Sequence, residues 1–220
     1  MKNKPIELVL IGDSQVGKTS IINIISGIGF DESLTRTVGV DFCYINLKLD
    51  DGTKTKIKVF DTSGQEQYHA ISLNVLRQSD GIILVFSKDS IDSFKNIKDI
   101  WIEKINQSIN MEDFSLILVE NKIDLEDSVI NEKDILDLKN EYKLDFIEVS
   151  AKMNKNIERL FKTITMKVLE KKNKDKKNKN KKNNDTKNKL PSEPDNTNNK
   201  KFKITKDKNK TEEKNKKNYC

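Results

Sequence analysis

The stretch Gly12-Asp13-Ser14-Gln15-Val16-Gly17-Lys18-Thr19 reads G-x-x-x-x-G-K-[ST] and follows an apolar run at residues 8–11. This pattern is typical of a phosphate-binding loop between a strand and a helix. Gly12 and Gly17 let the backbone curl, so that successive N–H groups and the first helical turn can converge on a polyphosphate. We expect Lys18 to bridge the β- and γ-phosphates and the Thr19 hydroxyl to ligate Mg²⁺.

Outward from this loop, short apolar runs alternate with amphipathic helical patterns. Strands are predicted at residues 41–49, 56–60, 81–86, 115–119 and 145–149, and helices at 90–107, 131–142 and 157–169. The turn signal Asp50-Asp51-Gly52 makes the first two strands a hairpin, and the aperiodic residues 27–39 form a long loop. The order predicts an α/β doubly wound sheet with ligands at the carboxyl ends of its strands.

A second motif, Asp61-Thr62-Ser63-Gly64-Gln65-Glu66, follows the hairpin. Asp61 suits Mg²⁺ binding through water, and Gly64 lets a backbone N–H approach the γ-phosphate. Gln65 can accept from and donate to a water molecule, so it can orient that water for in-line attack.

A third motif, Asn121-Lys122-Ile123-Asp124, comes directly after a predicted strand. The Asp124 carboxylate can accept two hydrogen bonds from the ring N–H and the exocyclic amine of guanine, a donor pair that adenine lacks. The shorter string Ser150-Ala151-Lys152 follows the last strand, where backbone N–H groups could reach the guanine carbonyl.

In this order, the motifs resemble the Ras superfamily of small GTPases over residues 6 to 170, and most closely its Rab branch. Thr37-Val38-Gly39-Val40-Asp41-Phe42 is similar to the Rab switch I signature. The resemblance implies a P-loop small G-domain whose six-stranded mixed sheet has one antiparallel edge strand and is flanked by helices. It also implies that Thr37 closes over Mg²⁺ and the γ-phosphate, and that Phe30 packs against guanine.

The expected site residues fall into three groups. The catalytic group is Gln65, Thr37, Gly64 and Lys18, and the metal group is Thr19, Thr37 and Asp61. The nucleotide-binding group is Gly12, Asp13, Ser14, Gln15, Val16, Gly17, Lys18, Thr19, Ser20, Phe30, Thr37, Gly64, Asn121, Lys122, Asp124, Ser150, Ala151 and Lys152.

Several positions depart from the family pattern. Phe60 and Ser63 replace the usual Trp and Ala, and Glu120 stands where a Gly often precedes the guanine motif. Val75 and Leu76 replace two aromatics of the family's effector-facing surface. These changes bear on effector choice and on nucleotide exchange or hydrolysis.

The charge of the chain is unevenly distributed. Residues 171–220 hold 19 lysines against 7 acidic residues, a net charge of +12, whereas the whole chain carries +6 and residues 1–170 carry −6. We expect a G-domain at 1–170 and a disordered Lys/Asn-rich tail at 171–220. The tail is open to three readings: low-complexity sequence without a function, an anionic membrane surface, or non-specific RNA binding. No specific nucleic-acid partner is expected.

The ends of the chain bear on its location. The N-terminus has no apolar signal core, and Cys43 and Cys220 form no disulfide framework, which fits a reducing cytoplasm. Cys220 is a single terminal cysteine rather than a C-a-a-X box or a double cysteine, so both prenylation and an inert thiol stay open. Prenylation would let the protein cycle onto the cytoplasmic face of a membrane with an escort protein.

The function implied is a GTP-binding switch that hydrolyses GTP slowly and depends on activating proteins, exchange proteins and effectors. Its ligands are GTP or GDP with Mg²⁺. Two other classes stay open: a nucleotide-locked binding module or signalling GTPase without a trafficking role, and a phosphate-loop kinase or ATPase. The guanine motif disfavours the second class.

Overall fold

The computed structural model describes residues 4–34, 40–62 and 73–187, and the chain divides into the units Met1–Asn180 and Lys181–Cys220. Among these residues six strands form one sheet in the order β2-β3-β1-β4-β5-β6. Only β2 is antiparallel to its neighbour, which confirms the mixed sheet with one antiparallel edge strand. The strands are β1 (Ile6–Ile11), β2 (Val40–Lys48), β3 (Lys54–Thr62), β4 (Gly81–Ser87), β5 (Ser115–Asn121) and β6 (Asp145–Glu148).

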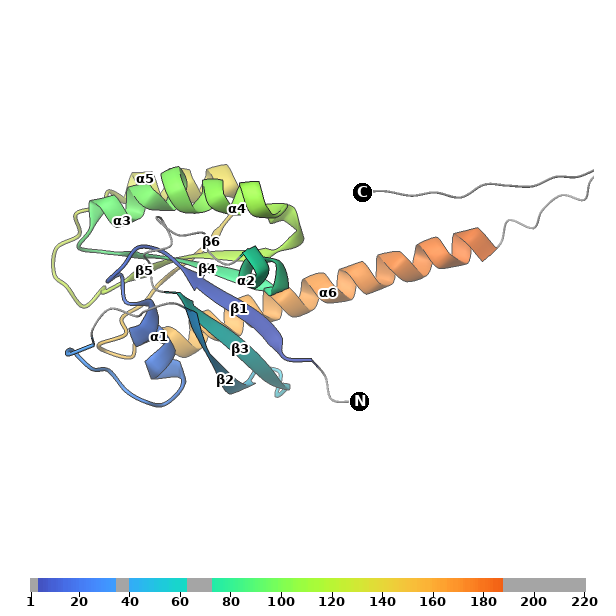
Figure 1. Ribbon diagram of the computed structural model, residues 1–220, viewed down its shortest axis with the longest axis horizontal. Helices are drawn as coiled ribbons and strands as arrows, with labels where there is room; N and C mark the ends of the chain where they lie inside the picture. Colours follow the sequence, from blue (N-terminus) through green and yellow to red (C-terminus); the bar gives the residue numbers. More distant parts are fainter. Residues whose placement is uncertain (1–3, 35–39, 63–72, 188–220) are drawn as a thin grey trace, which may run out of the picture. The chain divides into compact units, whose positions relative to one another are not determined.

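Helices cover both faces of this sheet (Figure 1). They are α1 (Lys18–Ile25), α2 (Leu73–Gln78), α3 (Ile91–Asn96), the π-helix η1 (Ile97–Ile102), α4 (Glu103–Ser108), the short 3₁₀-helix η2 (Met111–Asp113), α5 (Glu132–Tyr142) and α6 (Ile157–Lys187). Side chains from α1 and α6 form one apolar cluster with the sheet, and side chains from η1, α4 and α5 form a second cluster.

Strand β1 shows why the strands read as continuous apolar runs. All six of its residues are buried. Leu8 and Leu10 belong to the cluster of α1 and α6, whereas Val9 and Ile11 belong to the other cluster. A strand covered on both faces needs apolar side chains along most of its length, so alternation is absent from residues 8–11, and Glu7 is the one charged residue of β1.

The helix predicted at residues 90–107 is interrupted. Ser90 caps it as expected, because its hydroxyl accepts a hydrogen bond from the Ser93 N–H at 3.2 Å. Between α3 and α4, however, η1 is a π-helix. Apolar spacings of three and four did not reveal this change of turn.

The C-terminal helix is longer than the sequence suggests. Disorder is predicted from residue 171, but α6 continues to Lys187. Lys171 donates to the Phe114 carbonyl at 3.0 Å, and Lys172 pairs with Asp80 at 2.7 Å, so the first turn past residue 170 is held by the domain. A helix that is already nucleated then extends at little cost through Lys, a good helix former. Residues 188–220 lie outside the described residues.

Helix α2 corrects one expectation about the surface. The resemblance implies that Val75 and Leu76 lie on a partner-facing surface. Leu76, however, is 1% exposed and belongs to the apolar cluster of η1, α4 and α5, and Val75 is half-buried against that cluster. The replacement of an aromatic by Leu76 therefore changes core packing under α2.

Candidate nucleotide-binding site

The phosphate loop connects the end of β1 to the start of α1. Gly12 and Gly17 have φ angles of 152° and 94°. A Cβ atom on Gly12 would lie 2.0 Å from the Val85 carbonyl oxygen, and one on Gly17 would lie 2.3 Å from the Asn121 side-chain nitrogen. Both positions therefore exclude any larger residue.

Lys18 begins α1 and is 4% exposed. Its Nζ donates to the carbonyl oxygens of Gly12 and Asp13, each at 2.8 Å. These two bonds hold the ammonium group over the loop, where it can meet a phosphate oxygen.

The two proposed metal ligands with described positions lie together. Thr19 Oγ1 donates to Asp61 Oδ2 at 2.7 Å, although the two residues come from α1 and β3. A hydroxyl beside a carboxylate is the oxygen donor set that Mg²⁺ prefers, and Mg²⁺ takes most of its other ligands from water and phosphate. The part of the chain that the structure describes has no cluster of three or more Asp, Glu, His or Cys side chains that could hold a metal ion. Mg²⁺ bound through one or two protein ligands does not need such a cluster.

Asn121 joins three loops from a nearly fully buried position at the end of β5. Its Nδ2 donates to the Val16 carbonyl at 2.8 Å, and its Oδ1 accepts from the Ala151 N–H at 3.2 Å. This side chain therefore fixes the phosphate loop to the loop after β6. The motif predicts that Asn121 belongs to the binding site, and in the structure its side-chain amide holds two loops of that site together.

Asp124 is oriented by Ser150. The Ser150 hydroxyl donates to Asp124 Oδ1 at 2.5 Å and itself accepts from the Met153 N–H at 3.0 Å. Ser150 is fully buried, whereas Asp124 lines a cavity. One carboxylate oxygen is thereby held in place, and the group can present an acceptor edge to the cavity.

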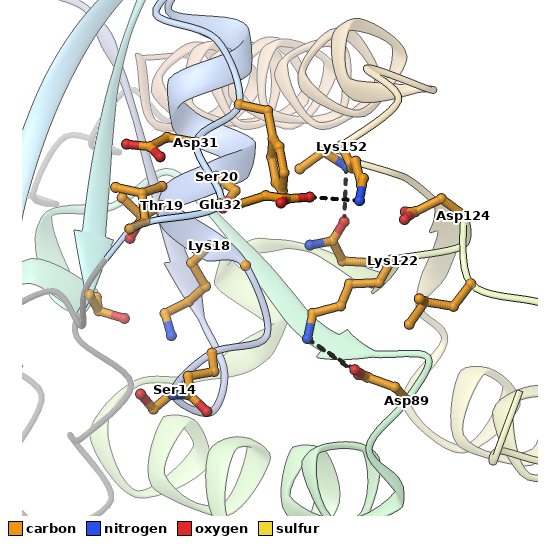
Figure 2. Close-up of a pocket in the computed structure, with 18 residues that line it drawn as sticks. Ser14, Lys18, Thr19, Ser20, Asp31, Glu32, Asp89, Lys122, Asp124 and Lys152 are labelled. Carbon is orange, nitrogen blue, oxygen red and sulfur yellow. Dashed lines mark hydrogen bonds and ion pairs between the residues drawn. The ribbon is translucent and has the colours of Figure 1, made fainter.

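This cavity has a volume of about 940 Å³ and is drawn in Figure 2. Two ion pairs border it, Lys122–Asp89 at 3.2 Å and Lys152–Glu32 at 2.7 Å. Burial raises the pKa of Asp89, but the Ser87 hydroxyl and Lys122 outweigh that effect and leave the pKa below its usual value.

The structure brings most of the predicted residues to this cavity. Twelve of them line it: Ser14, Gln15, Gly17, Lys18, Thr19, Ser20, Phe30, Asn121, Lys122, Asp124, Ala151 and Lys152. Gly12, Asp13, Val16, Asp61 and Ser150 support it from outside the lining. Thr37, Gly64, Gln65 and Cys220 lie outside the described residues.

Six lining residues were missed by the sequence analysis: Asp31, Glu32, Leu34, Thr62, Asp89 and Leu125. Asp89 follows the end of β4, so the rule that ligands bind beyond the carboxyl ends of strands could have found it. Asp31, Glu32 and Leu34 come from the aperiodic loop after α1 and carry no local signal.

The residues predicted to bind phosphate and those predicted to select the base lie at opposite ends of this arrangement. Lys18 and Thr19 lie at one end, and Asp124 and Lys152 lie at the other (Figure 2). A doubly wound sheet with this loop after β1 defines the P-loop nucleotide-binding class.

Comparison with known proteins narrows this class. The family model described as Ras family matches residues 7–170. The chain is 36% identical to Ras-related protein RABC1 of Arabidopsis thaliana over 165 residues, which is 74% of this chain and 77% of that protein. It is 37% identical to Ras-related protein Rab-10 of Diplobatis ommata over 166 residues, which is 75% of this chain and 82% of that protein. The chain belongs to the Ras family and is a Rab-like small GTPase.

Within residues 4–34, 40–62 and 73–187, no helix is long and apolar enough to cross a membrane.

Proposed function

We propose that this protein is a molecular switch of vesicle traffic that binds GTP with Mg²⁺ in the cavity beside the phosphate loop and hydrolyses it slowly. The observation that carries the proposal is the joining of Lys18, the Thr19–Asp61 pair and Asp124 around one cavity. Members of this family bind GTP or GDP with Mg²⁺ in general.

The proposed reaction uses these groups together with Gln65, Thr37 and Gly64, which lie outside the described residues. The loop N–H groups and Lys18 stabilise the phosphates, while Thr19 and Asp61 would hold Mg²⁺, whose charge offsets that of the phosphate oxygens. Water oriented by Gln65 attacks the γ-phosphorus, the bond to the β-phosphate oxygen breaks, and GDP and phosphate result. Thr37 and Gly64 would sense the γ-phosphate, so its loss would release the switch segments.

The first test is single-turnover hydrolysis of GTP by the purified full chain with Mg²⁺. Gln65→Leu should retain GTP binding and lose most hydrolysis, and Gln67→Leu, two residues away, serves as the matched control. Undiminished hydrolysis by Gln65→Leu would remove Gln65 from the mechanism. Binding of GTP without any hydrolysis by the wild-type chain would favour the nucleotide-locked module.

Base selection is tested by competition. Unlabelled GTP or GDP should displace a fluorescent GDP analogue, and ATP should not, because adenine leaves the Asp124 carboxylate without its two donors. Equal displacement by ATP would favour a phosphate-loop kinase or ATPase.

The proposed effector surface includes the exposed aromatics of β2. Phe42 and Tyr44 are each 51% exposed, and the ammonium groups of Lys58 and Lys56 lie 4.2 and 4.1 Å from their ring centroids. An effector that recognises the GTP-bound state would bury these rings, because exposed aromatics contribute strongly to interfaces. Activating and exchange proteins would bind the same side of the molecule as the effectors.

Membrane attachment is proposed to need both the basic tail and Cys220. One lipid chain anchors a protein only weakly, and each Lys near an anionic leaflet adds about 1 kcal/mol. Mass spectrometry of the C-terminal peptide from native cells should find a prenyl adduct on Cys220, and an escort protein would then extract the chain from the membrane. An unmodified thiol would point to a GTPase without membrane cycling.

A further inference from the structure

The side chain of Asp13 turns away from the cavity and contacts the helical segment that follows β4. The Trp101 ring N–H donates to Asp13 Oδ1 at 2.7 Å, and the Asn96 amide donates to Asp13 Oδ2 at 2.7 Å. Each carboxylate oxygen therefore has its own donor, supplied by a residue more than eighty positions along the chain.

The π-helix η1 explains how both donors reach one carboxylate. Asn96 precedes η1 and Trp101 lies within it, five positions later. In an α-helix, residues five apart point about 140° apart around the axis. The wider i→i+5 turn of a π-helix brings such residues close to one face, and π-turns occur often at functional sites.

Trp101 is held rigidly. It has no exposed surface and packs in the same apolar cluster as Ile102 and Ile105. Its ring nitrogen is consequently a fixed donor, and a partly buried carboxylate is tolerated only where hydrogen bonds replace its water. Asn96 is half-buried and supplies the second bond.

The bonds to Asp13 have a consequence for Lys18. The Asp13 carbonyl oxygen, together with that of Gly12, accepts the hydrogen bonds that hold the Lys18 ammonium over the loop. Because both carboxylate oxygens of Asp13 are hydrogen-bonded, the Asp13 side chain restricts the position of its own backbone carbonyl group. The position of the Lys18 ammonium thus depends on a helix that does not touch the cavity.

We propose that Asn96 and Trp101 are positioning residues for phosphate binding, which act through Asp13 on Lys18. The inference rests on the proposed binding of GTP and GDP at the phosphate loop. Loss of either donor leaves a charged oxygen unsatisfied, the loop shifts, and bound GDP dissociates faster. Selection of the base, which depends on Asp124 on another loop, is unaffected.

The test measures dissociation of a fluorescent GDP analogue from the full chain with Mg²⁺, by chase with excess GDP. Trp101→Phe keeps the aromatic packing and removes the N–H, and Asn96→Ala removes the other donor. Each should raise the dissociation rate about tenfold, the effect of one lost bond to a charged group. Ile105→Val is the matched control: it loosens the same cluster but should leave the rate unchanged.

A double-mutant cycle separates positioning from general destabilisation. In an Asp13→Ala background, Trp101→Phe and Asn96→Ala should change the rate less than twofold, and the preference for GDP over ADP should be unaltered. A tenfold effect that persists without the Asp13 carboxylate would overturn the inference, as would an equal effect of Ile105→Val. If Trp101→Phe does not fold, Asn96→Ala completes the cycle alone.

The outcome also separates this inference from the proposed function. Wild-type chain that binds no GDP would overturn both. Wild-type chain that binds GDP, with variants that release it at the wild-type rate, would overturn the positioning role alone.

Discussion

Gln15 lies in the middle of the phosphate loop with a φ of 68°, in the left-handed region. The left-handed conformation costs a residue with a Cβ about 1–2 kcal/mol, whereas it costs glycine almost nothing. Gln15→Gly should therefore raise the free energy of unfolding by about 1 kcal/mol, measured by urea denaturation of nucleotide-free protein.

Ser14→Gly is the matched control for that change. Ser14 is adjacent in the same loop and has no positive φ, so the substitution adds only backbone freedom to the unfolded chain. It should lower the free energy of unfolding by about 0.5–1 kcal/mol. If both substitutions stabilise the protein, or if neither does, then Gln15→Gly does not act by relieving backbone strain at position 15.

Glu120 is a buried carboxyl that precedes Asn121 on β5, with 5% of its surface exposed. Burial raises its pKa, Glu148 and Glu132 add to the effect, and Lys88 opposes it. The folded state therefore holds a proton that the unfolded state has released, and stability falls as the pH rises from the ordinary glutamate pKa of about 4.3 toward the raised value.

Glu120→Gln should remove this loss. The variant should gain stability relative to wild type as the pH rises from about 4 to neutrality. Unfolding free energies measured at several pH values give the difference. A difference that is constant with pH would mean that Glu120 titrates alike in both states.

At the residue scale, the sequence predicts which side chains form the site, but it does not predict which other side chains hold them in place. Lys18, Thr19 and Asp124 could be predicted because a local motif fixes their type and spacing. The support that Ser150 gives to Asp124 could not, because that contact joins residues 26 positions apart on different loops. Such bonds depend on the tertiary fold, which spacing alone does not contain.

At the scale of elements, an ion pair joins two loops at the end of the cavity where Asp124 lies. Glu32 follows α1, Lys152 follows β6, and their ion pair at 2.7 Å joins the loops. The hydrogen bond that Lys152 donates to Glu32 raises the pKa of Lys152, so its ammonium group stays charged at neutral pH. Both side chains are exposed, so salt should weaken their attraction.

Glu32→Gln should accordingly speed GDP dissociation by about two- to threefold at low salt. The effect should vanish near 1 M salt, where the screening length is about 3 Å. Glu141→Gln, which removes the similarly exposed Lys98–Glu141 pair away from the cavity, should leave the rate unchanged. A Glu32→Gln effect that is independent of salt would argue against an electrostatic tether.

Elements differ in how far their sequences reveal them. Buried strands such as β4 and β5 could be predicted because their central residues are a continuous run of buried apolar side chains. The π-turn of η1 could not be predicted from the spacing of apolar residues, and the contact of its Trp101 with Asp13 joins residues 88 positions apart. The extension of α6 was missed because its composition favours disorder, while the helix before it supplies the nucleus.

At the scale of the whole molecule, the cavity is lined by residues from Ser14 to Lys152, which the sheet brings together. A ligand that contacts all of these segments binds only the folded state, because the unfolded chain does not bring them together. Its binding energy therefore adds to the stability of the fold. At a GDP concentration of 100 times its Kd, the gain is about 2.7 kcal/mol. For a domain of this size, that raises the midpoint of thermal unfolding by about 5–10 °C.

Thermal unfolding with Mg²⁺ and increasing GDP checks this linkage. The midpoint should rise with the logarithm of the GDP concentration, whereas ADP at equal concentration should leave it unchanged because Asp124 finds no matching donors. Asp124→Ala should remove most of the GDP shift, and chelation of Mg²⁺ should reduce it, since Thr19 and Asp61 would hold an ion whose charge offsets that of the phosphates. An equal shift with ADP would mean that the phosphates bind without selection of the base, and the assignment of Asp124 would then be wrong.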